Sequence, residues 1–428
     1  MTFLERIFHL SQRGTSVRTE ILAGITTFST MVYIVFLNPV ILADAGMDFS
    51  AVMVSTILAA ALATLLMGIY GDYPFAQAPG MGLNAYFTYG VVITMGHTWQ
   101  AALGASFVAG AVFLILNLMG LRRRIMEAIA PSLRIAVTAG LGLFLALIGL
   151  KNVGLIAPDA VTVVSLGRID SPELLMAGIG LIATTVLLAR EVRGAFIFGI
   201  ALVWLISLVG GYTTWQGAFA LPPSVAPTFL QLDIKAALQP AMLGTVTSFV
   251  FIAIFDTAGT LTALAEQGGF LDNKGRLPRA QRALVTDAVA TMLGAAVGTS
   301  VMTTYLESAA GIQAGGRTGL TAIIVALLFL CTLAGSIPIY ATTPVLLIIG
   351  AMMLRPVTRL NWDDPTEMIP AFLILVTIPL TFSIATGIGV GFIVYPAIKL
   401  LTGRHRDIHA LTWILGIGFF LKFIFLPE

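Results

Sequence analysis

Apolar segments about as long as a bilayer-crossing helix, roughly 17–25 residues, recur along almost the whole chain. Lipid offers backbone groups no hydrogen-bond partner, so chains of this kind fold only as helices or closed barrels. The segments have helix length, which predicts an all-α polytopic membrane protein with fourteen spans. The spans are expected at 21–43, 51–70, 75–95, 99–119, 132–151, 172–189, 194–212, 240–265, 281–299, 301–315, 318–336, 339–354, 367–384 and 386–402.

A last apolar stretch, 410–426, is left over from this count. It is interpreted as a fifteenth span, as an interfacial helix, or as a sign that 367–402 is divided wrongly.

Composition supports a membrane protein and excludes several functions. The chain is 58% hydrophobic and only 10% charged, whereas a soluble domain carries about 25% charge. A net charge of +2 gives no basis for a nucleic-acid partner. The four histidines show no metal-ligand spacing, and no phosphate-binding loop, nucleophile elbow or HExxH is present. No enzyme, metal or cofactor is therefore expected.

The basic residues predict the orientation. If the N-terminus is cytoplasmic, 19 of the 23 Lys and Arg fall on the cytoplasmic side, as the positive-inside rule requires. The exceptions are Lys151, Arg168, Lys235 and Lys422. A multi-pass protein of the cell inner membrane with a cytoplasmic N-terminus is predicted.

The spans divide into two halves. An N-terminal segment, 1–20, precedes seven spans in 21–212, and a polar connection, 213–239, leads to seven more in 240–428. Seven is odd, so the second half starts on the opposite side, which gives an inverted repeat. The third span of each half is interrupted, by APGMGLN in one and by GTSVMTTYLES in the other. Paired interruptions of this kind mark a substrate site near the midplane.

Asp256 and Glu307 are acids inside apolar spans, 8 and 10. An ionisable group at membrane depth is costly and is by default a functional residue. Two such acids in matching regions favour a shared cavity. The alternatives are that Asp256 is a structural acid bonded to a neighbouring threonine, and that Glu307 lies at the water interface of a short span.

Other side chains could complete the site. Asn84 follows the break in span 3, although an Asn there could instead join two helices. Thr304 could offer a hydroxyl to a ligand or cap a helix, and Thr27 is a weaker candidate. Phe255 could supply a flat apolar wall, or simply pack in the core. The two acids accept hydrogen bonds when ionised and an Asn both donates and accepts, so a planar neutral ligand with N–H edges fits, as does a cation.

Several motifs resemble those of the AzgA-like purine nucleobase permeases, within the nucleobase:cation symporter group. These motifs are SQRGTSVRTEILAGITTF, NPVILADAGM, APGMGLNAYF, FDTAGTL and TTYLESAAGIQAGGRTGLTA. They occur in order over essentially the whole chain.

The resemblance implies fourteen helices in two inverted repeats, with short extended strands in spans 3 and 10. It implies a core domain of spans 1–4 and 8–11, and a gate domain of spans 5–7 and 12–14 that forms a homodimer contact. Residue by residue, Asp256, Glu307 and Asn84 match the family's polar site positions. The implied activity is proton-coupled uptake of adenine, hypoxanthine or guanine, with Na⁺ left open as the coupling ion.

The hypothesis for the mechanism gives the two acids unequal roles. Glu307 would bind a purine N–H and exchange the coupled proton, and Asp256 would bind another edge or relay a proton. Core movement against the gate would then alternate access. The alternatives are transport of another planar or anionic solute on the same fold, and a membrane receptor that binds without transport.

Overall fold

Helices make up nearly all of the regular structure. The computed structural model describes residues 3–120, 130–159, 163–192, 194–212, 223–272, 277–332, 339–381, 384–404, 406 and 408–425. Residues 213–222 of the connection at 213–239, and the arginine-bearing segments 121–129 and 273–276, lie outside these residues.

In the first half of the chain, regular elements lie within or close to each of the seven ranges named above. Its elements are α1 (Phe3–Phe8), α2 (Val17–Met31), α3 (Ile34–Ala43), α4 (Phe49–Leu66), η2 (Met67–Gly71), β1 (Gln77–Pro79), α5 (Met81–Ala85), η3 (Tyr86–Thr94), α6 (Trp99–Leu118), α8 (Pro131–Asn152), β2 (Ile156–Asp159), β3 (Val163–Leu166), α9 (Pro172–Ala189) and α10 (Ala195–Val209).

The second half follows the same pattern. Its elements are α11 (Ile234–Ala237), α12 (Pro240–Gly268), α13 (Ala280–Val297), β4 (Met302–Thr304), α14 (Ser308–Gln313), α15 (Gly319–Leu330), α16 (Ile339–Met353), η4 (Arg355–Arg359), α17 (Pro365–Thr381), α18 (Ile384–Leu401) and α19 (Ala410–Phe425). The leftover stretch is thus the helix α19, which packs against α18, and the division of 367–402 into two helices agrees with α17 and α18.

Side-chain caps explain where several of the helices begin. A hydroxyl or carboxylate at the N-cap accepts a hydrogen bond from a backbone N–H that the helix itself leaves unpaired. Ser16, Asp48, Thr98, Ser171 and Thr318 cap α2, α4, α6, α9 and α15 in this way. The caps fix the starts of helices whose apolar composition alone would leave their ends undefined.

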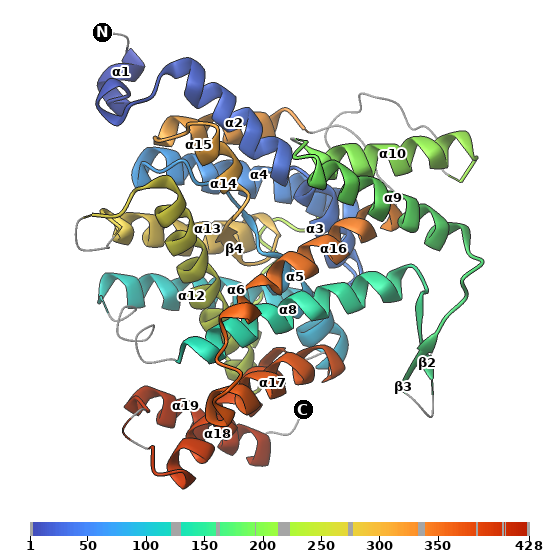
Figure 1. Ribbon diagram of the computed structural model, residues 1–428, viewed down its shortest axis with the longest axis vertical. Helices are drawn as coiled ribbons and strands as arrows, with labels where there is room; N and C mark the ends of the chain where they lie inside the picture. The colour runs from blue at the N-terminus through green and yellow to red at the C-terminus, as the bar shows by residue number, and fades with distance from the viewer. Residues whose placement is uncertain are drawn as a thin grey trace.

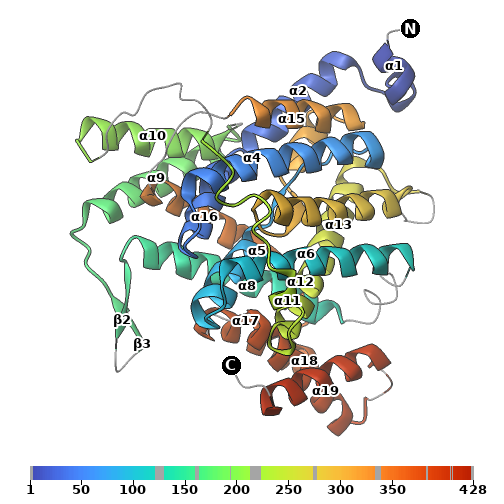
Figure 2. The ribbon, with the colours of Figure 1, turned by 180° about the vertical axis from the view of Figure 1, so that it is seen from behind.

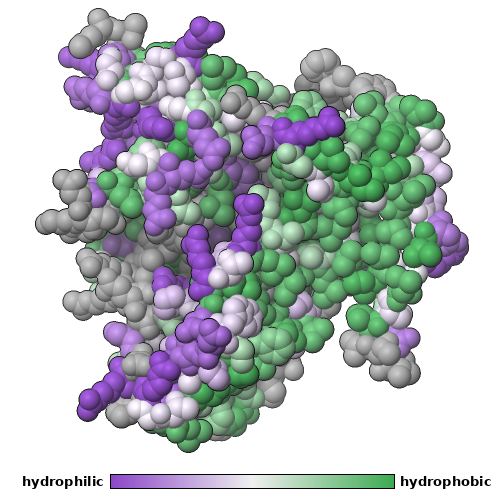
Figure 3. Space-filling view, viewed as in Figure 1, coloured by the Kyte–Doolittle hydropathy of each residue, from purple (hydrophilic) through white to green (hydrophobic). Residues whose placement is uncertain are grey.

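The surface is that of a protein surrounded by lipid. Five segments are long and apolar enough to cross a membrane: Val17–Ala43, Phe49–Gly71, Trp99–Leu118, Pro131–Asn152 and Pro172–Ala189. Large apolar side chains on α6, α9, α10 and α19 are exposed. Hydrophilic residues gather along one edge of the face in Figure 3, near the ends of the helices, and hydrophobic residues cover most of the rest. We conclude that the chain is a multi-pass membrane protein.

The contacts between helices divide them into two groups. The first helix group is α2–α6 and α12–α15 with strands β1 and β4, and the second is α8–α10 with α16–α19. In Figure 1, α9 and α10 lie at the upper right and α17–α19 at the bottom, around the first group; Figure 2 gives the reverse view. The groups meet where α5 contacts α8, α2 contacts α10, α3 contacts α16 and α12 contacts α18.

Two details of the fold differ from the prediction. A β-hairpin, in which Ile156 pairs with Leu166, projects from the bundle after α8 (Figure 1), so strands are not confined to spans 3 and 10. Its two strands, of four residues each, lie outside the predicted spans. The first span is two helices, α2 and α3, that meet at Val32 and Tyr33.

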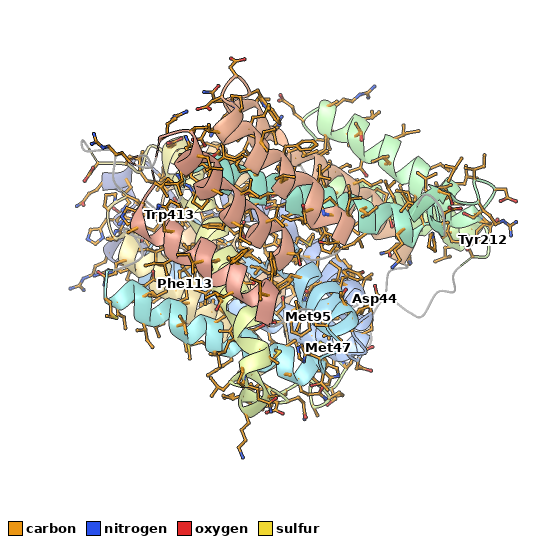
Figure 4. All side chains as sticks on the ribbon, turned by 90° about the horizontal axis from the view of Figure 1, so that it is seen from below. Asp44, Met47, Met95, Phe113, Tyr212 and Trp413 are labelled. Carbon is orange, nitrogen blue, oxygen red and sulfur yellow. The ribbon has the colours of Figure 1, made fainter. Side chains whose placement is uncertain are left out.

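A charged cluster ties the N-terminal segment to the first helix group. Asp72 accepts hydrogen bonds from two guanidinium groups. Arg13 donates to Oδ1 at 3.0 Å, and Arg279 donates to the same carboxylate. Burial by itself raises the pKa of Asp72, but the two arginines outweigh that effect and lower it. Seen from below in Figure 4, Asp44, Met47 and Met95 are drawn on one side of the bundle and Phe113 and Trp413 on the other.

Candidate functional site

Two short strands from the two halves of the chain meet inside the first helix group. β1 and β4 pair antiparallel, with Gln77 opposite Thr304, and all their residues are buried. The pairing continues past the strands, since Gly80 N donates to Val301 O at 2.9 Å and Tyr305 N donates to Ala76 O at 2.9 Å. The backbone of both interrupted spans is therefore hydrogen-bonded inside the protein, as membrane depth requires.

Glu307 follows β4 and immediately precedes α14, and its side chain is half-buried. The hydroxyl of Tyr33 donates to Glu307 Oε1 at 2.5 Å. The hydroxyl of Thr30 lies 3.4 Å from the backbone carbonyl of Glu307. Span 1 therefore holds this acid by its side chain, and Thr30 lies beside its main chain.

Asp256 approaches the same place from α12, which packs against both β4 and α14. The side chain of Thr303 lies beside its carboxylate, and Asp256 lies close enough to Glu307 for the two carboxylates to interact electrostatically. The two acids of spans 8 and 10 are thus neighbours. The side chain of Phe255 lies outside the part of the chain that the structure describes.

Asn84 is fully buried in α5, next to the strand crossing. Ser300, which precedes β4, donates a hydrogen bond to Asn84 Oδ1. The amide Nδ2 of Asn84 has no hydrogen-bond partner among the described residues. A buried N–H donor without a partner is costly, and a ligand acceptor would satisfy it.

Thr304 lies on the other face of β4, away from Asp256. Its hydroxyl donates to Asp287 Oδ1 at 2.8 Å, and Gln77 Nε2 donates to the same oxygen. Asp287 comes from α13 and is fully buried. This third acid therefore joins the two strands by accepting a hydrogen bond from each.

Thr27 lies where α2 crosses α14. A Cβ on Gly311 would stand 2.0 Å from Thr27 Oγ1, so only glycine permits this approach. The Thr27 hydroxyl is buried and has no partner among the described residues.

Sequence reasoning missed Tyr33 and Ser300. Tyr33 shares a helical face with Thr27 and Thr30, at a spacing of three residues each, and that polar stripe in an apolar span was the available signal. Ser300 carried no signal, because its contact with Asn84 joins residues 216 apart in sequence.

The arrangement suits recognition of a polar ligand that carries hydrogen-bond donors, whether neutral or cationic. Two carboxylates can accept hydrogen bonds, and one buried amide can donate. Among the described residues, no group of three His, Cys, Asp or Glu side chains could hold a metal ion.

The chain is similar in sequence to known permeases over nearly its full length. The model of the Permease family (Xan_ur_permease) matches residues 18–390. A permease of Methanocaldococcus jannaschii is 50% identical, covering 100% of this chain and 99% of that protein. The adenine permease AdeP of Escherichia coli is 41% identical, covering 99% and 96%. The guanine/hypoxanthine permease PbuO of Bacillus subtilis is 41% identical, covering 98% and 100%.

These matches confirm the predicted resemblance to AzgA-like purine nucleobase permeases. The relatives are transporters and not enzymes. Among solved structures, the transmembrane domain of the cyanobacterial bicarbonate transporter BicA superposes with a TM-score of 0.65 at 14% identity, covering 87% of this chain and 97% of that one. At that identity the likeness shows the fold, a helical membrane-transporter fold, and no more.

Proposed function

We propose that this chain, which belongs to the Permease family, carries purine nucleobases across a membrane. The names of the relatives AdeP and PbuO support adenine, guanine and hypoxanthine as the substrate class. The observation that carries the proposal is the meeting of Asp256 and Glu307 beside the crossing of β1 and β4.

The chemistry of the base matches these side chains. A purine presents N–H donors along its edge, which the carboxylates of Asp256 and Glu307 accept, and ring nitrogens that take a donated hydrogen bond. The buried amide of Asn84 supplies such a donor. An anionic solute would meet two carboxylates instead, which disfavours that alternative.

Glu307 is proposed to exchange the coupled proton. Asp256 is proposed to bind another edge of the base or to relay a proton. A carboxylate in an apolar site exchanges its proton readily when a charged neighbour or a ligand changes. Na⁺ as the coupling ion is the competing proposal. A neutral base moved together with a proton would accumulate in the cell at the expense of the pH gradient.

The membrane arrangement is proposed to be fourteen spans in two inverted repeats, with a cytoplasmic N-terminus in the cell inner membrane. Antiparallel pairing of strands from the two halves supports the inversion. The first and second helix groups correspond to a core and a gate whose relative movement alternates access, and the gate forms the homodimer contact.

Reconstitution tests the proposal. Purified protein in liposomes should take up radiolabelled hypoxanthine when the outside is acidic, and unlabelled adenine or guanine should compete where uracil and bicarbonate do not. Collapse of the pH gradient with an ionophore should abolish accumulation but leave counterflow. Binding without counterflow would identify a receptor. Accumulation driven by a Na⁺ gradient alone would show that Na⁺, and not the proton, is the coupling ion.

A further inference from the structure

Tyr33 occupies an unusual place in span 1. It stands where α2 ends and α3 begins and is 1% exposed. The hydroxyl of Thr30 bonds back to the Thr27 carbonyl at 2.8 Å, which is a contact that bends helices. The break turns the Tyr33 side chain toward Glu307, on the far segment between β4 and α14.

The tyrosine contacts both helix groups. Its hydroxyl donates to Glu307 Oε1 at 2.5 Å, within the first group. Its ring packs on the ring of Phe196 in α10, with centroids 5.3 Å apart and planes tilted by 54°, and α10 belongs to the second group. No other side chain of the described residues is seen to bridge the Glu307 carboxylate to that group.

The hydrogen bond distinguishes the two oxygens of Glu307. Oε1 is held by Tyr33, whereas no other described side chain donates to Oε2. We infer that Tyr33 is a positioning residue for transport, which commits one oxygen of Glu307 to the protein and leaves the other for the substrate N–H. This inference rests on the proposed function.

The same bond contributes to when Glu307 holds a proton. A donor hydrogen bond favours the ionised carboxylate. The other titratable groups that face Glu307 are Asp256 from α12, whose charge opposes ionisation, and Tyr305, whose hydroxyl donates to the Pro79 carbonyl at 2.6 Å. Tyr33 therefore supplies the donor that opposes Asp256, and its loss lets Glu307 keep its proton to higher pH.

The contact with Phe196 links the Tyr33–Glu307 hydrogen bond to movement between the two helix groups. A shift of α10 against α2 moves the ring of Tyr33 and so strains or releases its bond to Glu307. Proton exchange at Glu307 is in this way tied to the movement of the second helix group.

The test compares pH profiles of hypoxanthine uptake in proteoliposomes. Tyr33→Phe keeps the ring on Phe196 and removes only the donor, and should move the midpoint of the profile upward by about one pH unit, since one charged hydrogen bond is worth roughly that shift. Replacement of Tyr33 by 3-fluorotyrosine, a stronger donor of the same shape, should move the midpoint downward. The fluorinated protein keeps the test valid if Tyr33→Phe fails to fold.

Tyr89→Phe is the matched control. Tyr89 also donates to a carboxylate, Asp44 Oδ2, at 2.6 Å, but contacts neither Asp256 nor Glu307. Its profile should match that of the wild type. A Tyr33→Phe profile superimposed on the wild type, or an equal shift in Tyr89→Phe, overturns the inference and leaves the proposed function intact. If the wild type itself takes up no purine, the proposed function fails and the inference falls with it.

Discussion

Thr303 and Thr304 are adjacent in β4, yet their hydroxyls serve two different acids on opposite faces of the strand. Thr303 lies beside Asp256, next to Glu307, and Thr304 donates to Asp287 Oδ1 at 2.8 Å. Side chains alternate between the two faces of a strand, so this pair separates the acid of the candidate site from the acid that holds the strands together.

The two threonines are therefore expected to respond differently to the same substitution. Thr303→Val removes the hydroxyl beside Asp256 and should raise the KM for hypoxanthine about tenfold, if that hydroxyl donates to the carboxylate, since hydrogen bonds to charged groups are worth about 1.5–3 kcal/mol. Thr303→Ser keeps the hydroxyl and should stay near the wild type. Uptake kinetics in proteoliposomes measure both.

Thr304→Val should instead destabilise the protein. It takes one donor from the buried carboxylate of Asp287, which costs about 1.5–3 kcal/mol of unfolding free energy. We expect a lower Tm in detergent and a KM within about twofold of the wild type. A KM defect as large as that of Thr303→Val would show that both faces of β4 contact the substrate.

A close crossing of α8 and α16 predicts a second stability effect. A Cβ on Gly142 would stand 2.6 Å from the Gly350 carbonyl oxygen, and a Cβ on Gly350 would stand 2.5 Å from the Gly142 carbonyl oxygen. Either glycine changed to alanine should lower the unfolding free energy by about 1–3 kcal/mol, a typical cost of overpacking. Gly178→Ala on α9, where no atom lies within 4 Å of the new Cβ, is the control and should leave the Tm unchanged.

A buried ion pair holds the second helix group together. Lys399 Nζ lies 2.7 Å from Glu367 Oε1, with 1% of the lysine side chain exposed. Lys399→Met leaves that carboxylate uncompensated and should cost about 3–5 kcal/mol. The double change Lys399→Met with Glu367→Gln should recover much of the loss. Additive losses in thermal unfolding would contradict a coupled pair.

The acid stability of one helix end is set by Asp364. Hydrogen bonds from Arg404 and Thr366 lower the pKa of Asp364 to about 2. A carboxylate with a lowered pKa stabilises the fold fully above its unfolded pKa of about 3.9, and this contribution is lost as the pH falls toward the folded value. The Tm difference between the wild type and Asp364→Asn should be constant from pH 7 to about pH 5 and shrink between about pH 4 and pH 2. A difference that grows on acidification would contradict the expected loss of the Asp364 contribution at low pH.

The helical membrane-transporter fold was predictable, because the length and hydrophobicity of apolar segments are local properties of the sequence. Pro79 and Gly80 predicted the interruption of span 3, and the structure has strand β1 there. The pairing of β1 with β4 fixes which side chains face each other, and a shift by one residue would have exchanged the faces of Thr303 and Thr304. Register between segments 225 residues apart has no local signal.

The same limit applies to the candidate site. Asp256 and Glu307 were identified because charge at membrane depth is costly wherever it occurs. Tyr33 continues the polar stripe of Thr27 and Thr30, but the stripe does not say which residue it meets, and only the distance from Glu307 gives Tyr33 its role. The membrane arrangement of the two acids was thus predictable, and their partners were not.

The central claim is that Glu307 joins purine binding to proton movement. Its most direct test is gradient-driven hypoxanthine uptake by Glu307→Gln in proteoliposomes, beside counterflow in the same vesicles. Glutamine keeps the size and one acceptor of glutamate but cannot exchange a proton. The expected result is that an imposed pH gradient no longer drives accumulation. Uptake at the wild-type rate with the wild-type dependence on the gradient would contradict the claim.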